Sequence, residues 1–173
     1  MLAENLSDVF QRGLEFAYDG ERQIAKSLAK LAEASSSPEL KAIFQSQAQQ
    51  AKANEKRLEK IFADLKRAPA GEANKAVASV LDESEKLIKH IDRSALLDSA
   101  LLVQGHLLAH AGIGLYGSLG AVATALKLNS VAESLQESLA TLKQGIAHLD
   151  QVADKTYPAA VSVLNSPHGF AII

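Results

Sequence analysis

The fold of this chain is decided by residues 6–34, which read LSDVFQRGLEFAYDGERQIAKSLAKLAEA. Apolar residues recur in this stretch at alternating spacings of four and three, at Phe10, Leu14, Ala17, Ile24, Leu28 and Leu31. This periodicity predicts a long amphipathic helix with one face in a core. Glu21 falls on the same face, so the sequence places one carboxylate among core residues.

Length and composition describe one soluble globular domain. The chain has 173 residues, 47% of them hydrophobic and 22% charged, with a formal net charge of -2. This balance fits neither a disordered chain nor a nucleic-acid-binding protein. There is no cysteine, which excludes disulfides and thiolate metal sites. The first residues show no signal peptide, so we expect a cytoplasmic protein.

Four further helical segments follow the first. They cover about residues 38–67, a shorter amphipathic stretch at 77–91, an apolar stretch at 94–126, and 130–157. No segment alternates with the period of a strand. The sequence therefore predicts an all-α fold, a ferritin-like four-helix bundle with a long crossover that contains a short extra helix. We expect residues 1–157 to form this bundle, with the last helix ending near Tyr157 and Pro158.

The segment from Ala100 to Leu126 is long and apolar enough to cross a bilayer. It also contains Gln104, His106 and His110 and lacks anchoring residues at both ends, so we interpret it as buried in protein and expect no membrane partner. Glycine and alanine recur along it, at Gly105, Ala109, Gly112, Gly114, Gly117 and Gly120. Such glycines indicate close helix packing, including packing across a dimer interface, or room for an apolar ligand. The face with Gly105, Ala109 and Gly112 is the candidate.

More apolar surface is present than one bundle core covers. The third long helix is apolar around most of its circumference, and residues 158–173 form an apolar tail that we expect to dock on the bundle or on a partner protein. We therefore expect a homo-oligomer, most simply a homodimer.

Several short motifs resemble those of the YciE/YciF-type ferritin-like bacterial stress proteins. The similarity extends over roughly residues 6–154 and rests on four patches, YDGERQ at 18–23, SSPELK at 36–41, RLEKIF at 57–62 and YGSL at 116–119. The resemblance implies a ferritin-like bundle and a role in stress. It also implies carboxylates, with occasional histidines, on the inward faces of the four long helices, as in a dinuclear metal site.

Most positions that the resemblance assigns to metal ligands lack acids in this chain. Glu21 matches the acid of the first helix. The second helix has amides instead, at Gln47, Gln50 and Asn54. The positions on the third helix are Ala109 and Gly112, and those on the fourth are Thr141, Leu142 and Ile146. The resemblance thus implies a degenerate metal site and no cofactor.

Physical chemistry leads to the same expectation, because one carboxylate cannot balance the charge of two hard cations. We expect Glu21 to form a buried polar cluster with Gln47, Gln50 and Asn54 that fixes the helix register. His106 and His110 are four residues apart and offer the rival interpretation, metal ligation on one helix face. A separate alternative for the function is a residual metalloprotein, in which Glu21 and His110 hold one iron or manganese ion and support an oxidase or peroxide-handling activity.

These observations favour a non-catalytic, stress-associated binding or structural protein derived from the ferritin-like scaffold. No arrangement of serine, histidine and acid indicates a nucleophilic enzyme.

Overall fold

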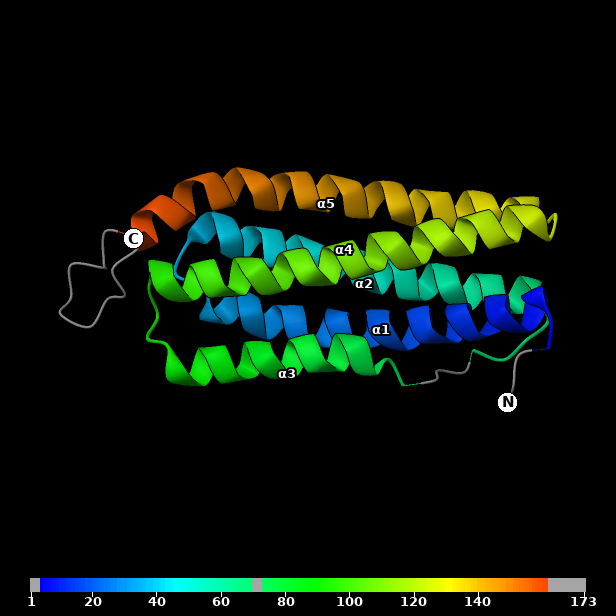
Figure 1. The fold of residues 1–173 in the computed structure, drawn as a ribbon, viewed down its shortest axis with the longest axis horizontal. Helices are drawn as coiled ribbons and strands as arrows, with labels where there is room; N and C mark the ends of the chain where they lie inside the picture. Colours follow the sequence, from blue (N-terminus) through cyan, green and yellow to red (C-terminus); the bar gives the residue numbers. More distant parts are fainter. Residues whose placement is uncertain (1–3, 70–72, 162–173) are drawn as a thin grey trace.

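The computed structural model describes residues 4–69 and 73–161. These residues form five helices and no strand: α1 (Leu6–Ala34), α2 (Pro38–Asp64), α3 (Lys75–His90), α4 (Ala95–Ala125) and α5 (Asn129–Val161). The predicted all-α class is confirmed. The four long helices run along one another as a bundle, and α3 is the short extra helix in the crossover (Figure 1).

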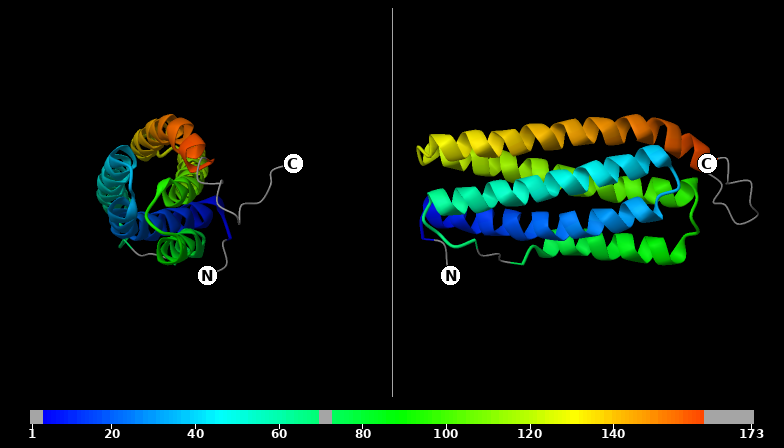
Figure 2. Two further views of the ribbon diagram at one scale, coloured as in Figure 1. Left: turned by 90° about the vertical axis from the view of Figure 1, so that its left-hand side faces the viewer. Right: turned by 180° about the vertical axis from the view of Figure 1, so that it is seen from behind.

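The bundle consists of two antiparallel hairpins, α1 with α2 and α4 with α5 (Figure 1). The crossover from α2 to α4 returns along the length of the bundle, and α3 packs against α1 and α4 over one half of it. Seen end-on, α4 lies between α3 and α5 on one flank of the molecule (Figure 2, left). The outer side of α4 is therefore bordered by a helix on each side.

The start of α2 is fixed from two directions. The Ser37 side chain accepts a hydrogen bond from the Leu40 backbone N–H at 3.3 Å, and Pro38 occupies the first helical turn. Asp98 of α4 reaches the same turn, and its two carboxylate oxygens accept from the backbone N–H groups of Ser36 and Ser37 at 2.8 and 2.9 Å. Asp98 is buried, and the sequence pattern did not single it out.

The C-terminal ends of α2 and α4 have the same turn. After the C-cap residue of α2 and of α4 comes a lysine in the left-handed backbone region, Lys66 with φ 54° and Lys127 with φ 60°. The backbone N–H groups of the residues that follow, Arg67 and Leu128, donate to helix carbonyls five residues back at 2.8 and 2.9 Å. This pattern usually contains glycine at the left-handed position.

The last helix is longer than predicted. α5 continues through Pro158 to Val161, whereas we expected it to end near Tyr157 and Pro158. Proline removes a single backbone hydrogen bond, and in α5 it stands in the last turn, where little helix follows it. The first residues of the predicted tail, 158–161, therefore belong to α5, and residues 162–173 lie outside the described residues.

The core has two parts, one in each half of the bundle. One contains Phe44, Leu101 and Leu149 and is covered by α3 through Val77 and Leu81. The other contains residues nearer the far end, among them Leu14, Phe62 and Leu135. Along α1 and α2, the buried polar residues Glu21 and Asn54 separate the residues of one part from those of the other.

α4 is, among the described residues, the one helix long and apolar enough to cross a membrane by length and composition alone. In the structure it is a bundle helix, since Leu101 and Leu102 are completely buried and the helix packs against α1, α3 and α5. Only 33% of its most apolar window is buried within the chain. Its outer face is therefore exposed.

Candidate functional site

Glu21 occupies the middle of α1 with its side chain buried against α2 and α4. One carboxylate oxygen, Oε1, accepts two hydrogen bonds, from Asn54 Nδ2 at 3.0 Å and from the Tyr116 hydroxyl at 2.8 Å. The other oxygen, Oε2, has no hydrogen-bond partner among the described residues. The predicted pairing of Glu21 with Asn54 is present, and Tyr116 is an additional donor.

The polar contacts continue from Asn54 to the last helix. Arg57 Nη1 donates to Asn54 Oδ1 at 2.9 Å and to the Ser138 hydroxyl at 3.0 Å, while Nη2 contacts Glu137 at 3.1 Å. Ser138 is completely buried. We call Glu21, Asn54, Arg57, Tyr116 and Ser138 the polar layer. It contains side chains of all four long helices and joins both hairpins.

Burial controls the protonation of Glu21. Loss of solvation raises the pKa of its carboxyl to about 7, and the hydrogen bonds from Tyr116 and Asn54 oppose this rise. The pKa of the Tyr116 hydroxyl is raised well above its usual value, first by burial and then by the adjacent Glu21. Glu21 therefore carries a proton in a large fraction of molecules at neutral pH.

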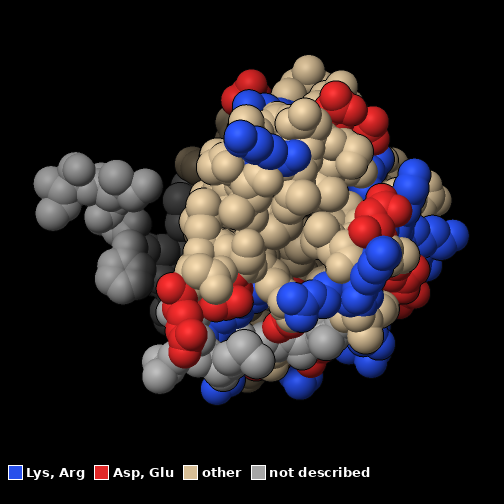
Figure 3. Space-filling model, turned by 90° about the vertical axis from the view of Figure 1, so that its right-hand side faces the viewer, with Lys and Arg blue, Asp and Glu red and all other residues tan. Residues whose placement is uncertain are grey.

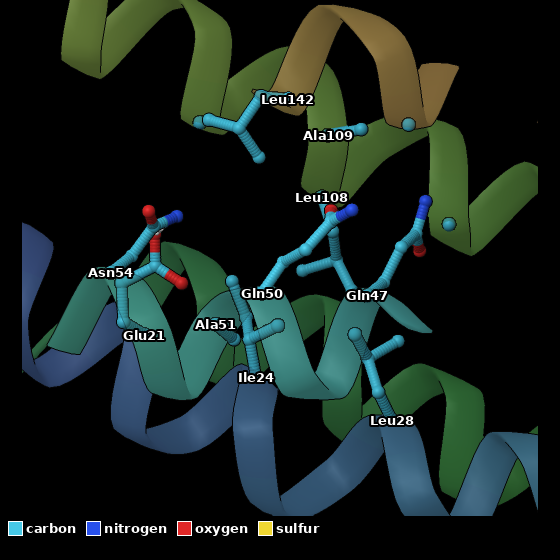
Figure 4. Close-up of a pocket in the computed structure, with 13 residues that line it drawn as sticks. Glu21, Ile24, Leu28, Gln47, Gln50, Ala51, Asn54, Leu108, Ala109 and Leu142 are labelled. Atoms are coloured by element: carbon cyan, nitrogen blue, oxygen red, sulfur yellow. Dashed lines mark hydrogen bonds between the residues drawn. The ribbon is translucent and has the colours of Figure 1, made fainter. Parts of the chain in front are cut away.

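A cavity of about 50 Å³ extends from Glu21 along the bundle axis. Figure 4 shows the Glu21 carboxylate near one end, with the amides of Gln50 and then Gln47 further along. The cavity has space for a few water molecules and is well below the 150 Å³ or so that accommodates benzene. Its lining consists of Glu21, Ile24, Leu28, Gln47, Gln50, Ala51, Asn54, Gly105, Leu108, Ala109, Gly112, Leu142 and Gly145.

The side chains of Gln47 and Gln50 line the same cavity as Glu21 and form no hydrogen bond with another described residue. The predicted cluster of Glu21, Gln47, Gln50 and Asn54 is thus brought to one cavity, but only Asn54 contacts the carboxylate. Glu21 is the one ionisable residue in the cavity lining.

The glycines of α4 that face inward allow close packing. A Cβ atom at Gly105 would lie 3.1 Å from Phe44 Cε1, and one at Gly112 would lie 3.1 Å from Leu142 Cδ1. Ala109 lies between these glycines and also lines the cavity. The side chains of Phe44 and Leu142 thus occupy most of the space that the missing methyl groups leave.

The two histidines of α4 do not meet Glu21. His110 is exposed and is absent from the cavity lining. His106 is half-buried, and its ring nitrogens contact the Leu102 carbonyl oxygen at 2.9 Å and Asp150 Oδ1 at 3.0 Å. Within residues 4–69 and 73–161 no group of three or more His, Cys, Asp or Glu side chains is placed to hold a metal ion.

Sequence reasoning missed three members of the polar layer. Tyr116 continues the spacing of Gly105, Ala109 and Gly112, and this pattern places it on the same inward face. Arg57 follows Asn54 by three residues and could have been assigned to the same side of α2. Ser138 carries no local signal, because its partner Arg57 is 81 positions away.

Comparison with known proteins agrees with these features of sequence and fold. Residues 5–162 match the family described as Domain of unknown function (DUF892). Protein YciF of Escherichia coli (strain K12) is 26% identical over 144 residues, which cover 80% of this chain and 84% of YciF.

Two solved structures share the fold. The E. coli stress protein YciF superimposes with a TM-score of 0.86 at 24% identity, covering 90% of this chain and 99% of that one. YcfI, a proposed structural protein from Rhodopseudomonas palustris, gives a TM-score of 0.82 at 25% identity, covering 85% and 94%. With the family match over nearly all described residues, the chain belongs to the DUF892 family of YciF-type proteins, which have a ferritin-like bundle.

Proposed function

We propose that this protein is a non-catalytic, stress-associated structural or binding protein of the cytoplasm whose bundle centre does not form a dinuclear metal site. The observation that carries the proposal is the composition of the cavity lining, where Glu21 is the one ionisable side chain. The relatives support the biological context, since YciF is named a stress protein and YcfI a proposed structural protein.

The donor set does not fit two metal ions. Hard cations such as Fe²⁺ and Mn²⁺ prefer several anionic oxygens, and amide oxygens are weaker, neutral ligands. Oε1 of Glu21 already accepts from Tyr116 and Asn54. The Arg57 guanidinium, bonded to Asn54, adds positive charge near the site and lowers its affinity for a cation. The side chains of the cavity therefore suit a network of neutral hydrogen bonds better than a dinuclear centre.

The polar layer has a structural role in this proposal. Hydrogen bonds of the layer join Glu21 of α1 to α2 and α4, and Arg57 of α2 to Ser138 of α5. A shift of one helix along its axis would therefore leave buried donors and acceptors unpaired. The layer joins side chains of all four long helices near the middle of the bundle. It fixes the alignment of the two hairpins without a metal.

Metal analysis tests the proposal. The protein is purified without chelators, incubated with excess Fe²⁺ or Mn²⁺ under anaerobic conditions, desalted, and measured by plasma mass spectrometry. We expect much less than one ion per chain and the same content in Glu21→Gln.

Two ions per chain that are lost in Glu21→Gln would overturn the proposal. One ion per chain that is lost in both Glu21→Gln and His110→Ala would establish the alternative, a residual iron or manganese site for oxidase or peroxide chemistry. The structure gives that alternative little support, because His110 is exposed whereas Glu21 is buried.

A further inference from the structure

Among the described residues, two acidic side chains are buried, and the protein uses them differently. At the end of the bundle with the α4–α5 turn, by contrast, charged side chains gather at the surface, on one side and along the bottom of the view (Figure 3). Both carboxylate oxygens of Asp98 accept hydrogen bonds from backbone N–H groups. In Glu21, Oε1 accepts two hydrogen bonds and Oε2 accepts none from a described residue. Oε2 is therefore a buried polar atom with no partner in the described part of the chain.

Oε2 borders the cavity next to Glu21. Every enclosed side-chain nitrogen or oxygen atom of the described residues has a hydrogen-bond partner. Because Oε2 has none, protein atoms do not enclose it completely. Figure 4 shows one oxygen of Glu21 directed into the cavity, toward the side on which Gln50 lies. A ligand in the cavity can therefore reach Oε2.

The carboxyl proton of Glu21 belongs on Oε2. A carbonyl oxygen has two lone pairs, and the Asn54 amide and the Tyr116 hydroxyl occupy both lone pairs of Oε1. Burial raises the pKa of this carboxyl to about 7, so at pH 6 most molecules carry the proton. The Oε2–H group then donates into the cavity and needs an acceptor there.

Two amide groups face the same space. Gln47 and Gln50 line the cavity, are half-buried, and lie further from its Glu21 end (Figure 4). Gly145 leaves room for them, because a Cβ there would lie 3.3 Å from Gln47 Nε2 and 3.8 Å from Gln50 Oε1. The cavity thus has a proton donor at one end and unpaired amide donors and acceptors beyond it.

The cavity limits a ligand to very few atoms. Its volume is about 50 Å³, whereas one water molecule needs about 10–15 Å³ and benzene binds in a cavity of about 150 Å³. A molecule of roughly three or four non-hydrogen atoms fits between these limits. Ile24, Leu108 and Leu142 provide an apolar wall, which suits a ligand with a methyl group.

We propose that the cavity binds a small neutral molecule with a primary carboxamide group, such as acetamide. The carbonyl oxygen of the ligand accepts from Glu21 Oε2–H, its NH₂ group donates to a glutamine side-chain oxygen, and its methyl group contacts the apolar wall. An alcohol carries donor and acceptor on one atom, and a carboxylate brings a charge that the lining does not balance. The inference rests on the proposed function, because it requires a bundle centre without metal ions.

A second cavity, of about 70 Å³, lies between α1, α3 and α4 and is also lined by Glu21. Its other polar side chains are already paired. Asn74 is bonded to the Phe16 carbonyl and the Val77 N–H, and Tyr116 is bonded to Glu21. The unpaired amides belong to the first cavity, which is therefore the one that suits a carboxamide.

Three probes of the same size test the chemical class of the ligand. Acetamide, acetone and acetate each have about four non-hydrogen atoms, but acetone lacks N–H donors and acetate is an anion at about pH 6. Each is titrated into ¹⁵N-labelled full-length protein at this pH, and the amide NMR signals are followed. For acetamide we expect saturable shifts at Gly105 and Gly145, which line the first cavity, with a dissociation constant of roughly 1–50 mM. Acetone should bind at least about threefold more weakly, and acetate should give no saturable shift.

Substitutions of the lining test the contacts. Gln50→Met removes the amide and keeps the length of the side chain, so it should weaken acetamide binding at least about fivefold. Gln49→Met is the matched control, because Gln49 is exposed and does not line the cavity, and the affinity should stay within about twofold of the parent. Glu21→Gln keeps a donor and an acceptor and should still bind acetamide, whereas Glu21→Leu should not. Circular dichroism shows that each variant is folded.

Three results would overturn the inference: no saturable shift with acetamide, which would mean that the cavity holds water alone; equal affinities for acetamide and acetone; and shifts at Gly20 without shifts at Gly145, which would place the ligand in the second cavity. Metal analysis of the same samples separates the inference from the proposed function. Metal-free protein that does not bind acetamide would overturn the inference alone, whereas two ions per chain would overturn the proposed function as well.

Discussion

At the scale of single residues, the burial of Glu21 makes the stability of the protein depend on pH. Its carboxyl group is buried beside neutral donors, and burial raises its pKa from 4.5 to about 7. The folded protein therefore holds a proton that the unfolded chain releases between these two pH values. By linkage, the free energy of unfolding contributed by this group is fully present below pH 4.5 and is lost as pH rises toward 7.

Glu21→Gln should remove this pH dependence. At pH 5 the variant keeps the acceptor for Tyr116 and Asn54, and we expect a change of less than about 1 kcal/mol in the free energy of unfolding. At pH 8 the parent has a buried charge and the variant does not, so the variant should be more stable by roughly 2–3 kcal/mol. Urea denaturation of both proteins at the two pH values measures this. A stability difference that does not change with pH would show that Glu21 titrates near its ordinary pKa.

Tyr116→Phe removes one of the two donors to the Glu21 carboxylate. We expect a loss of about 1–2 kcal/mol at pH 5 and a larger loss at pH 8, because hydrogen bonds to an ionised acceptor are stronger. Tyr18→Phe is the matched control. The Tyr18 hydroxyl donates to Glu59 at 3.2 Å in a partly exposed position, so its removal should cost less than about 1 kcal/mol. Equal losses in the two variants would contradict a special role for the polar layer.

At the scale of elements, the two ends of the bundle differ in how much their turns contribute to stability. Asp98 of α4 satisfies two backbone N–H groups at the start of α2 and so connects the hairpins at one end of the bundle. At the other end, two lysines adopt a backbone conformation that costs residues with a Cβ roughly 1 kcal/mol. We therefore expect substitution of Asp98 to destabilise the protein, and replacement of a lysine in these turns by glycine to stabilise it.

Asp98→Ala leaves the N–H groups of Ser36 and Ser37 without their buried acceptor. We predict a loss of about 2–4 kcal/mol, with Asp98→Asn intermediate because one acceptor oxygen is kept. Asp92→Ala, an exposed site shortly before α4, serves as the control and should change stability by less than about 0.5 kcal/mol. Thermal and chemical denaturation report all three. An Asp98→Ala variant as stable as the control would mean that water replaces the carboxylate.

Lys127→Gly should stabilise the protein. Glycine adopts a positive φ without steric cost, and we expect a gain of up to about 1 kcal/mol in the free energy of unfolding. Lys127→Ala removes the same charge and side chain but retains the Cβ, so it should give no gain. A similar increase in both variants would trace the effect to the lysine charge instead of the backbone.

The helices could be predicted from the sequence because α1, α2, α3 and α5 repeat apolar residues with helical spacing, whereas α4 is one long apolar run. The predicted end of α5 was wrong, since Pro158 indicates a stop in most helices but one proline in a final turn is tolerated. Within the site, Glu21 was identified because a charge interrupts an apolar face. Tyr116 was not assigned as its partner, because the two residues are 95 positions apart and only the packing of α1 beside α4 joins them.

At the scale of the whole molecule, each half of the bundle has its own apolar cluster, and the cavity and polar layer occupy the middle. The half with Phe44 and Leu101 is covered by α3, and the half with Leu14 and Leu135 is not. α3 itself buries only Val77, Leu81 and Ser84, so it is a cover and contributes little to the central core. The exposed apolar side chains of α4, Leu96, Val103 and Leu107, lie outside both clusters.

The pairing of neighbouring helices into two hairpins also bears on the order of folding. The hairpins close through the short turns at residues 35–37 and 126–128, so their contacts cost little chain entropy when they form. We therefore expect α3 to pack only after both hairpins are in place. In stopped-flow measurements, Leu135→Ala should mainly slow refolding, because Leu135 belongs to the α4–α5 hairpin. Val77→Ala should mainly accelerate unfolding. Refolding rates that respond equally to both substitutions would show that the crossover forms together with the hairpins.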